Sequence, residues 1–264
     1  MRGTLFRAVL AMTLTVGIAI AGGSAEAAVK TKTIEYQDGG TTLKGVLAWD
    51  DSISGKRPGV LVIHEWWGLN DYAKGRATRL AEEGYVAFAL DMYGDDKVTS
   101  HGSQAGEWMK QITANVAAWR QRANAGLAIL KAQPQVDAGK LAAIGYCFGG
   151  ATVMQMAYAG SDVKAVVSFH GSLPPAPEDV TAVAPRVLVA HGRDDAFIPA
   201  ERIDAFQKGL DRVGADWEMT IYSGTRHGFT NPGAGSYGID NLAYNKAADE
   251  RSWAAMMKLF GEVF

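Results

Sequence analysis

Cysteine is nearly absent from this sequence, because Cys147 is the single one among 264 residues. One cysteine excludes an intramolecular disulfide, and it excludes a zinc site built from several thiolates. A surplus of one charge is missing too, since 26 Lys and Arg residues stand against 28 Asp and Glu residues. Binding to nucleic acid without sequence preference needs a basic surplus, so we expect no nucleic-acid partner.

The motifs that hold nucleotides or metal ions are also missing. No G-x-G-x-x-G follows a predicted strand, there is no P-loop, and the five histidines form neither H-x-x-x-H nor H-E-x-x-H. We therefore predict no cofactor and no metal. What remains is a composition of 48% hydrophobic and 20% charged residues, which is typical of a globular protein and excludes wholesale disorder.

Long hydrophobic runs are limited to the N-terminus. The 14 residues from Ala8 to Ala21 follow Arg2 and Arg7 and precede Ala25-Glu26-Ala27, a small-x-small cleavage pattern. A membrane anchor is the alternative, but a spanning helix needs about 20 apolar residues. We predict a signal peptide over residues 1–27, cleaved after Ala27, and an exported mature chain, 28–264, that is periplasmic or secreted and makes no further membrane contact.

Strand and helix patterns alternate along the mature chain. Strands are expected at 30–37, 42–49, 59–63, 85–90, 141–146, 163–169, 185–190 and 217–222, and helices at 70–83, 102–132, 148–158, 199–213 and after 241. Such an order predicts a single α/β domain with a mainly parallel, twisted sheet flanked by helices. Catalytic groups of such folds gather beyond the carboxyl ends of the strands.

Cys147 follows the predicted strand 141–146 within Gly145-Tyr146-Cys147-Phe148-Gly149. This is the strand–nucleophile–helix turn of hydrolases with Cys in place of Ser, in which flanking glycines avoid a clash. The helix that follows aims its N-terminus at the sulfur and favours a thiolate. A buried structural cysteine is the alternative, but its position at a strand–helix junction favours a nucleophile.

Two further strand ends supply an acid and a base. Asp195 follows the strand 185–190, with Asp194 as a competing candidate, and His227 follows the strand 217–222. A turn aspartate and a solvated loop histidine are the structural alternatives. The order Cys147, Asp195, His227 is nucleophile, acid, histidine, as in α/β-hydrolases.

The strand 59–63 leads into His64-Glu65-Trp66-Trp67. We expect the backbone N–H groups of Trp66 and Phe148 to form an oxyanion hole, and Glu65 to face the thiol. The alternative is that the tryptophans cap the core and Glu65 is solvated. The residues expected to shape the substrate pocket are Trp67, Tyr93 and His170.

These residues carry a resemblance to the dienelactone hydrolase family of α/β-hydrolases, over roughly residues 30–264. The matching motifs are His64-Glu65-Trp66-Trp67-Gly68-Leu69-Asn70, Asp91-Met92-Tyr93, Gly145 to Gly150, Gly192-Arg193-Asp194-Asp195 and His227-Gly228-Phe229. The resemblance implies a Cys147–Asp195–His227 triad and a Glu65 that pairs with the thiol. It also implies hydrolysis of a lactone or small ester through a thioester, without metal or cofactor.

The sequence departs from the founding enzyme of that family at two substrate-binding positions. That enzyme has an arginine shortly after its Asp-Leu-Tyr motif and another four residues after its histidine, where this chain has Gly94 to Asp96 and Asn231. The sequence therefore leaves the physiological substrate open. We expect a monomer. A non-catalytic binding protein on the same fold and a redox-active thiol protein are the alternative functions.

Overall fold

The computed structural model describes residue 1 and residues 29–264. Apart from Met1, the predicted signal peptide and its cleavage site after Ala27 lie outside the described residues. Within the described part of the chain, no helix is both long and apolar enough to cross a membrane.

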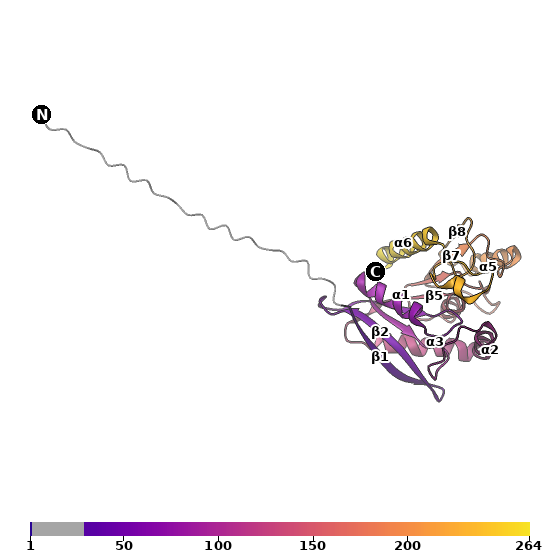
Figure 1. Ribbon diagram of the computed structural model, residues 1–264, viewed down its shortest axis with the longest axis horizontal. Coiled ribbons are helices and arrows are strands. Elements are labelled where there is room, and N and C mark those ends of the chain that lie inside the picture. Colours follow the sequence, from indigo (N-terminus) through magenta and orange to yellow (C-terminus); the bar gives the residue numbers. More distant parts are fainter. Residues whose placement is uncertain (2–28) are drawn as a thin grey trace.

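The centre of the molecule is an eight-stranded sheet in the order β1-β2-β4-β3-β5-β6-β7-β8 (Figure 1). β1 and β2 are antiparallel and are joined by a turn at Gly39-Gly40, β2 is also antiparallel to β4, and all pairs from β4 to β8 are parallel. Both turn glycines have positive φ, as a two-residue hairpin turn requires. The strands are β1 (Val29–Asp38), β2 (Thr41–Asp50), β3 (Arg57–Ile63), β4 (Val86–Leu90), β5 (Val136–Tyr146), β6 (Ala165–Phe169), β7 (Arg186–Gly192) and β8 (Trp217–Tyr222).

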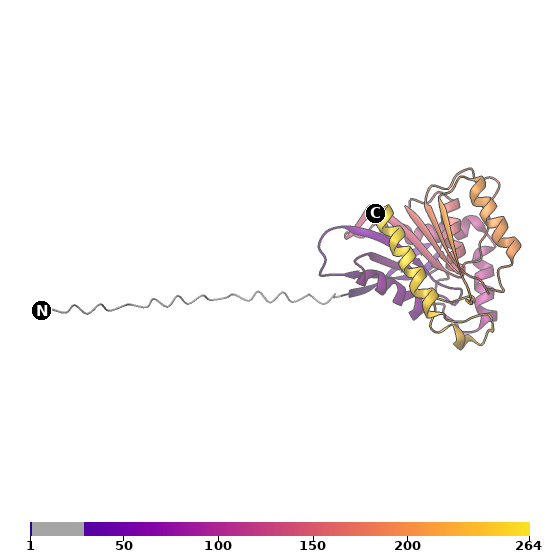
Figure 2. The ribbon, with the colours of Figure 1, turned by 90° about the horizontal axis from the view of Figure 1, so that it is seen from above.

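Helices cover both faces of this sheet. α1 and α6 pack on one face, and α3, α4 and α5 pack on the other (Figure 2). The central strands β4 and β6 are buried at every residue, which explains why their sequences are almost entirely apolar. The helices are α1 (Asp71–Glu82), α2 (Gly102–Thr113), α3 (Val116–Lys131), α4 (Phe148–Tyr158), α5 (Ala200–Arg212) and α6 (Lys246–Val263), with a short 3₁₀ turn at Ala234–Tyr237.

The long helix expected over 102–132 is wrong in one respect, because the chain breaks it into α2 and α3. Asn115 leaves the helical conformation at φ −120° and its side chain accepts a hydrogen bond from the backbone N–H of Ala118, so it begins a new helix. Asparagine is among the best residues for this position. The break lets α2 turn away from α3, and Val116 is exposed instead of joining the apolar face.

Candidate active site

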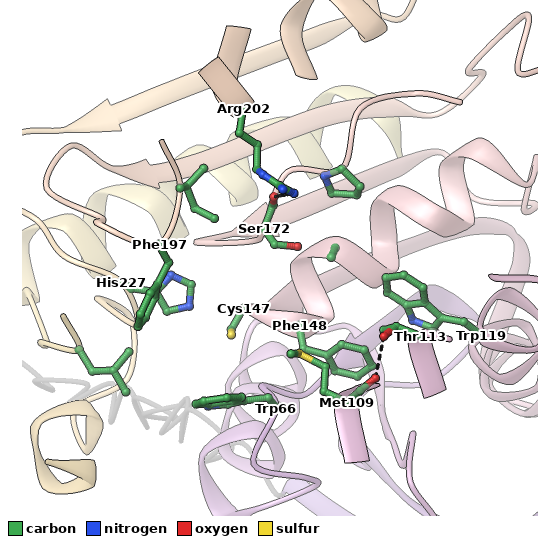
Figure 3. Close-up of a pocket in the computed structure, with 14 residues that line it drawn as sticks. Trp66, Met109, Thr113, Trp119, Cys147, Phe148, Ser172, Phe197, Arg202 and His227 are labelled. Atoms are coloured by element: carbon green, nitrogen blue, oxygen red, sulfur yellow. Dashed lines mark hydrogen bonds between the residues drawn. The ribbon is translucent and has the colours of Figure 1, made fainter. Parts of the chain in front are cut away.

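Cys147 occupies a tight turn between β5 and α4. Its backbone lies at φ 53° and ψ −111°, a strained conformation for a residue other than glycine. A β-carbon on Gly145 would collide with the carbonyl group of Gly149, and one on Gly149 would collide with the carbonyl oxygen of Ile63. The glycines are therefore needed for the turn to close against β3, and the turn presents Cys147 to a cavity at the start of α4 (Figure 3).

His227 and Asp195 meet at the same edge of the sheet, beyond β8 and β7. The Nδ1 atom of His227 donates a hydrogen bond to Oδ2 of Asp195 at 2.7 Å. The other carboxylate oxygen of Asp195 accepts from the backbone N–H of Phe197 at 3.0 Å and from the Nδ2 amide of Asn241 at 3.2 Å. The Asp195 carboxylate is thus fixed from both sides, and it fixes the imidazole. Asn241 was not expected from the sequence.

The His227 ring and Cys147 both line the cavity, and the ring faces the sulfur (Figure 3). Burial by itself would lower the pKa of His227, but its electrostatic interactions and hydrogen bonds with Cys147 and Asp195 raise that pKa to about 10. Burial likewise favours a neutral Asp195, yet the hydrogen bond and charge of His227 hold the pKa of Asp195 below its usual value. The three groups are electrostatically coupled. Asp194 is exposed and contributes only its backbone N–H, to the carbonyl of Thr225.

The cavity beside Cys147 has a volume of about 500 Å³ and mostly apolar walls. Trp66 lines one side, and Met109 and Thr113 of α2 with Trp119 of α3 form a wall that the sequence did not predict (Figure 3). No motif marks α2, because its contribution depends on the break at Asn115. A cavity of this size suits a small organic molecule.

The two residues whose backbone N–H groups were expected to form an oxyanion hole, Phe148 and Trp66, both line this cavity. Phe148 is the first residue of α4, so its N–H has no acceptor within the helix. The N–H of Trp66 belongs to the peptide group whose carbonyl, that of Glu65, accepts a hydrogen bond from Nδ1 of His64. Since the carbonyl and N–H of a trans peptide point in opposite directions, buried His64 directs the Trp66 N–H away from itself. His64 is held in turn by the backbone N–H of Met92, at 3.1 Å from its Nε2 atom.

His170 was expected to line the pocket, but it lies behind the turn and is fully buried. Its Nδ1 atom accepts a hydrogen bond from the backbone N–H of Cys147 at 3.2 Å, and its Nε2 atom lies 2.7 Å from Oγ1 of Thr230. Burial holds the pKa of His170 well below its usual value, so the ring is neutral. Its position therefore supports the Cys147 backbone and leaves no face open to a substrate.

Trp67 and Tyr93 also differ from the pocket-lining prediction. Trp67 is 1% exposed and stacks on Tyr237 at a centroid distance of 3.8 Å, away from the cavity that its neighbour Trp66 lines. Tyr93 packs against Phe148, and its hydroxyl donates to the carbonyl oxygen of Trp66 at 3.1 Å. Consecutive side chains point to different sides of the turn, so of Trp66 and Trp67 only Trp66 reaches the cavity. Tyr93 steadies the cavity wall from behind.

Glu65 is buried beside the loop after β8 that carries His227 and Asn231. Its Oε2 atom accepts a hydrogen bond from Nδ2 of Asn231 at 2.7 Å, and the structure gives it no hydrogen bond to Cys147 within residues 29–264. Burial raises the pKa of Glu65 to about 7, although the Asn231 hydrogen bond and the positive charges of His227 and Arg76 oppose this shift. Asn231, at one of the positions where the founding enzyme of the resembling family has arginine, is thus a partner of Glu65.

The pKa of Glu65 predicts a pH-dependent stability. The folded state holds the Glu65 proton more tightly than an unfolded chain does, in which a glutamate has a pKa near 4.5. The protonated carboxyl therefore contributes fully to the free energy of unfolding below pH 4.5, and this contribution is lost as the pH rises through about 7. We expect the free energy of unfolding of the wild type to fall by about 3 kcal/mol relative to Glu65→Gln across that range.

Urea unfolding of both proteins at several pH values measures this difference. Glu201→Gln is the control, because Glu201 is exposed and its curve should parallel that of the wild type. Parallel curves for the wild type and Glu65→Gln would mean that Glu65 titrates as it does in water.

A mostly parallel sheet with a strained turn after β5 and a histidine–aspartate pair beyond β8 and β7 defines the α/β-hydrolase class. The family model of the dienelactone hydrolases matches residues 43–264, so the chain belongs to the dienelactone hydrolase family. The family match and the similarity to relatives named as hydrolases identify this protein as an ester hydrolase.

Three known proteins illustrate the relationship. The crystal structure of a dienelactone hydrolase-like promiscuous phosphotriesterase from metagenomic libraries is 42% identical, covers 90% of this chain and 100% of its own, and superposes with a TM-score of 0.87. A Klebsiella pneumoniae structure, at 22% identity and a TM-score of 0.71, covers 89% and 99% and shares the fold. A Synechocystis protein provisionally named carboxymethylenebutenolidase is 27% identical over 250 residues, which are 88% of this chain and 96% of the relative.

Proposed function

We propose that the protein hydrolyses a lactone or a small carboxylic ester through a thioester on Cys147, with Asp195 and His227 completing a triad. The observation that carries the proposal is the hydrogen-bonded pair of His227 and Asp195, with the imidazole facing the sulfur in an apolar cavity. A binding protein would have no need for three coupled groups at three strand ends.

The first half of the reaction forms the thioester. The Cys147 thiolate, paired with the His227 imidazolium, attacks the carbonyl carbon, and the charge that develops on the oxygen is accepted by the N–H groups of Phe148 and Trp66. His227 then gives its proton to the leaving oxygen as the carbon–oxygen bond breaks. An acyl group on Cys147 and a free alcohol result; in a lactone, both remain on one molecule.

The second half regenerates the thiolate. His227, now neutral and still oriented by Asp195, takes a proton from a water molecule that attacks the thioester carbonyl. The carbon–sulfur bond breaks, the acid leaves, and the thiolate–imidazolium pair returns. Glu65 also belongs to this proposal. It is a second buried carboxyl beside the loop that carries His227, and the ionisation of Glu65 near neutral pH alters the electrostatic potential at His227.

The experiment that tests the proposal follows ester turnover and intact mass in the same reaction. A panel of activated esters, lactones and one neutral phosphotriester is mixed with the mature protein, the last because a 42% identical relative is described as a phosphotriesterase. We expect turnover together with a transient mass increase of one acyl group, mapped to Cys147. Turnover that persists in Cys147→Ala contradicts a thioester on Cys147, and neither turnover nor adduct in the wild type favours a binding role.

We further propose that residues 1–27 direct export and that the mature protein is a monomer in the periplasm or outside the cell. Support comes from the basic residues, the apolar run and the Ala25-Glu26-Ala27 pattern. N-terminal sequencing of the protein made in its host tests this, and a chain that still begins at Met1 contradicts it.

A further inference from the structure

Arg202 is a charged side chain at the rim of an otherwise apolar cavity. Fourteen residues line this cavity, and among them Arg202 and His227 are the two with basic side chains. None of the fourteen carries a carboxylate. The side chain extends from the first turn of α5 to the neighbourhood of Ser172, across the cavity from Trp66 (Figure 3).

The guanidinium of Arg202 is largely without partners in the described part of the chain. Its single hydrogen bond runs from a terminal nitrogen to the carbonyl oxygen of Ser172 at 3.5 Å, which is long for such a bond. No carboxylate of residues 29–264 forms an ion pair with it. By contrast, Arg186 pairs with Asp216 and Glu262 at the surface. A guanidinium has five N–H donors, so most of those of Arg202 are free to meet a ligand.

One of the two positions at which the founding enzyme of the family has an arginine is occupied here by Asn231, whose side chain is already engaged. The side-chain amide of Asn231 donates a hydrogen bond to Glu65. The cation at this cavity therefore comes from α5, a different element on a different wall. An unpaired guanidinium beside an apolar cavity is suited to a carboxylate, which it can bind through two parallel hydrogen bonds.

We propose that Arg202 forms an anion-recognising subsite, and that the enzyme prefers esters or lactones that carry a carboxylate some bonds away from the carbonyl it attacks. The proposal rests on the hydrolase function proposed above. Arg202 is a specificity residue in it and takes no part in bond making. Because it contacts the substrate equally before and during the reaction, its loss raises KM and leaves kcat nearly unchanged.

The test compares matched pairs of aryl esters that differ only in a terminal carboxylate or methyl group, placed on the acyl chain in one pair and on the alcohol in the other. We expect Arg202→Gln to lower kcat/KM about tenfold for the charged ester of at least one pair, mainly through KM, and to leave the neutral esters within about twofold. Arg202→Lys should restore part of the loss. Added salt should weaken the wild-type preference, because the rim is exposed.

Lys208→Gln provides the matched control. Lys208 lies on the same helix, is exposed outside the cavity and pairs with Asp204 at 2.7 Å, so its removal makes the same change in net charge. It should leave every ester unaffected. If Arg202→Gln changes the charged and neutral esters equally, or neither, the subsite does not exist although the hydrolase function stands.

A second measurement decides the matter if no ester is turned over. Cys147 is the single cysteine, so its alkylation by 3-maleimidopropionate and by neutral N-ethylmaleimide can be followed by intact mass. We expect the ratio of the two rates to fall severalfold in Arg202→Gln and to be unchanged in Lys208→Gln. An unchanged ratio in Arg202→Gln overturns the proposal independently of any hydrolysis.

Discussion

Replacing Cys147 with Ala is expected to lower kcat/KM for ester hydrolysis by about ten-thousandfold or more. The substitution removes the sulfur that faces His227 and leaves the turn intact, because alanine can occupy the same backbone conformation at a similar cost. What remains is binding and the N–H groups of Phe148 and Trp66, which can polarise the carbonyl but form no covalent bond. Initial rates with an activated ester and circular dichroism of the variant give the measurement and its folding control.

Cys147→Ser is the informative companion. It places a nucleophilic oxygen in the same turn, but a hydroxyl must lose its proton to His227 during the attack, whereas the proposed mechanism starts from a thiolate already paired with the imidazolium. We expect activity between that of the wild type and that of Cys147→Ala. If the alanine variant retained the wild-type rate, another group would be the nucleophile and the thioester mechanism would fall.

Asp195→Asn is expected to reduce kcat/KM by about a thousandfold or more while leaving the fold in place. Backbone N–H of Phe197 and the amide of Asn241 both donate to Oδ1 of Asp195, so the oxygen of a new asparagine stays there. Its NH₂ group then faces Nδ1 of His227, which must accept the hydrogen bond. The proton moves to Nε2, and the ring presents a donor to Cys147 where the reaction needs a base.

The neighbouring aspartate supplies the control for this variant. Asp194→Asn removes the same charge one residue away, from a side chain that is exposed and has no contact with His227. Its kcat/KM should stay within about twofold of the wild type. Equal losses in the two variants would mean that general electrostatics, and not the hydrogen bond at 2.7 Å, explain the role of Asp195.

Much of this fold could be predicted because its local signals are strong. Short apolar stretches mark β3 and β4, and the helix after Cys147 was placed at its observed bounds. The break at Asn115 was missed because Val116 and Trp119 continue the spacing of one long amphipathic helix. The junction is set by one hydrogen bond to the capping side chain of Asn115, and a pattern of hydrophobic residues does not reveal such a bond.

The site could be predicted as far as it depends on the ends of strands. Cys147, Asp195 and His227 each follow a strand of a parallel sheet, so topology alone brings them to one edge. The cavity walls and the partners of Glu65 depend on how loops fold back, over 166 residues between Glu65 and Asn231. For the same reason, Trp67 and His170 were assigned to the cavity although both are packed behind it.

The two sides of the cavity differ in how firmly the rest of the molecule holds them. Every residue of α4, which carries the turn at Cys147, is buried, whereas α2 has a single buried residue, Ala105, although it supplies Met109 and Thr113 to the cavity. Local opening is easiest where few side chains are buried. The residue at the reacting turn and part of the wall that limits the shape of a substrate are thus held by different helices, α4 and α2. Mutations that accumulate in α2 can broaden or shift the range of acyl groups over evolutionary time, while the reacting groups stay in register.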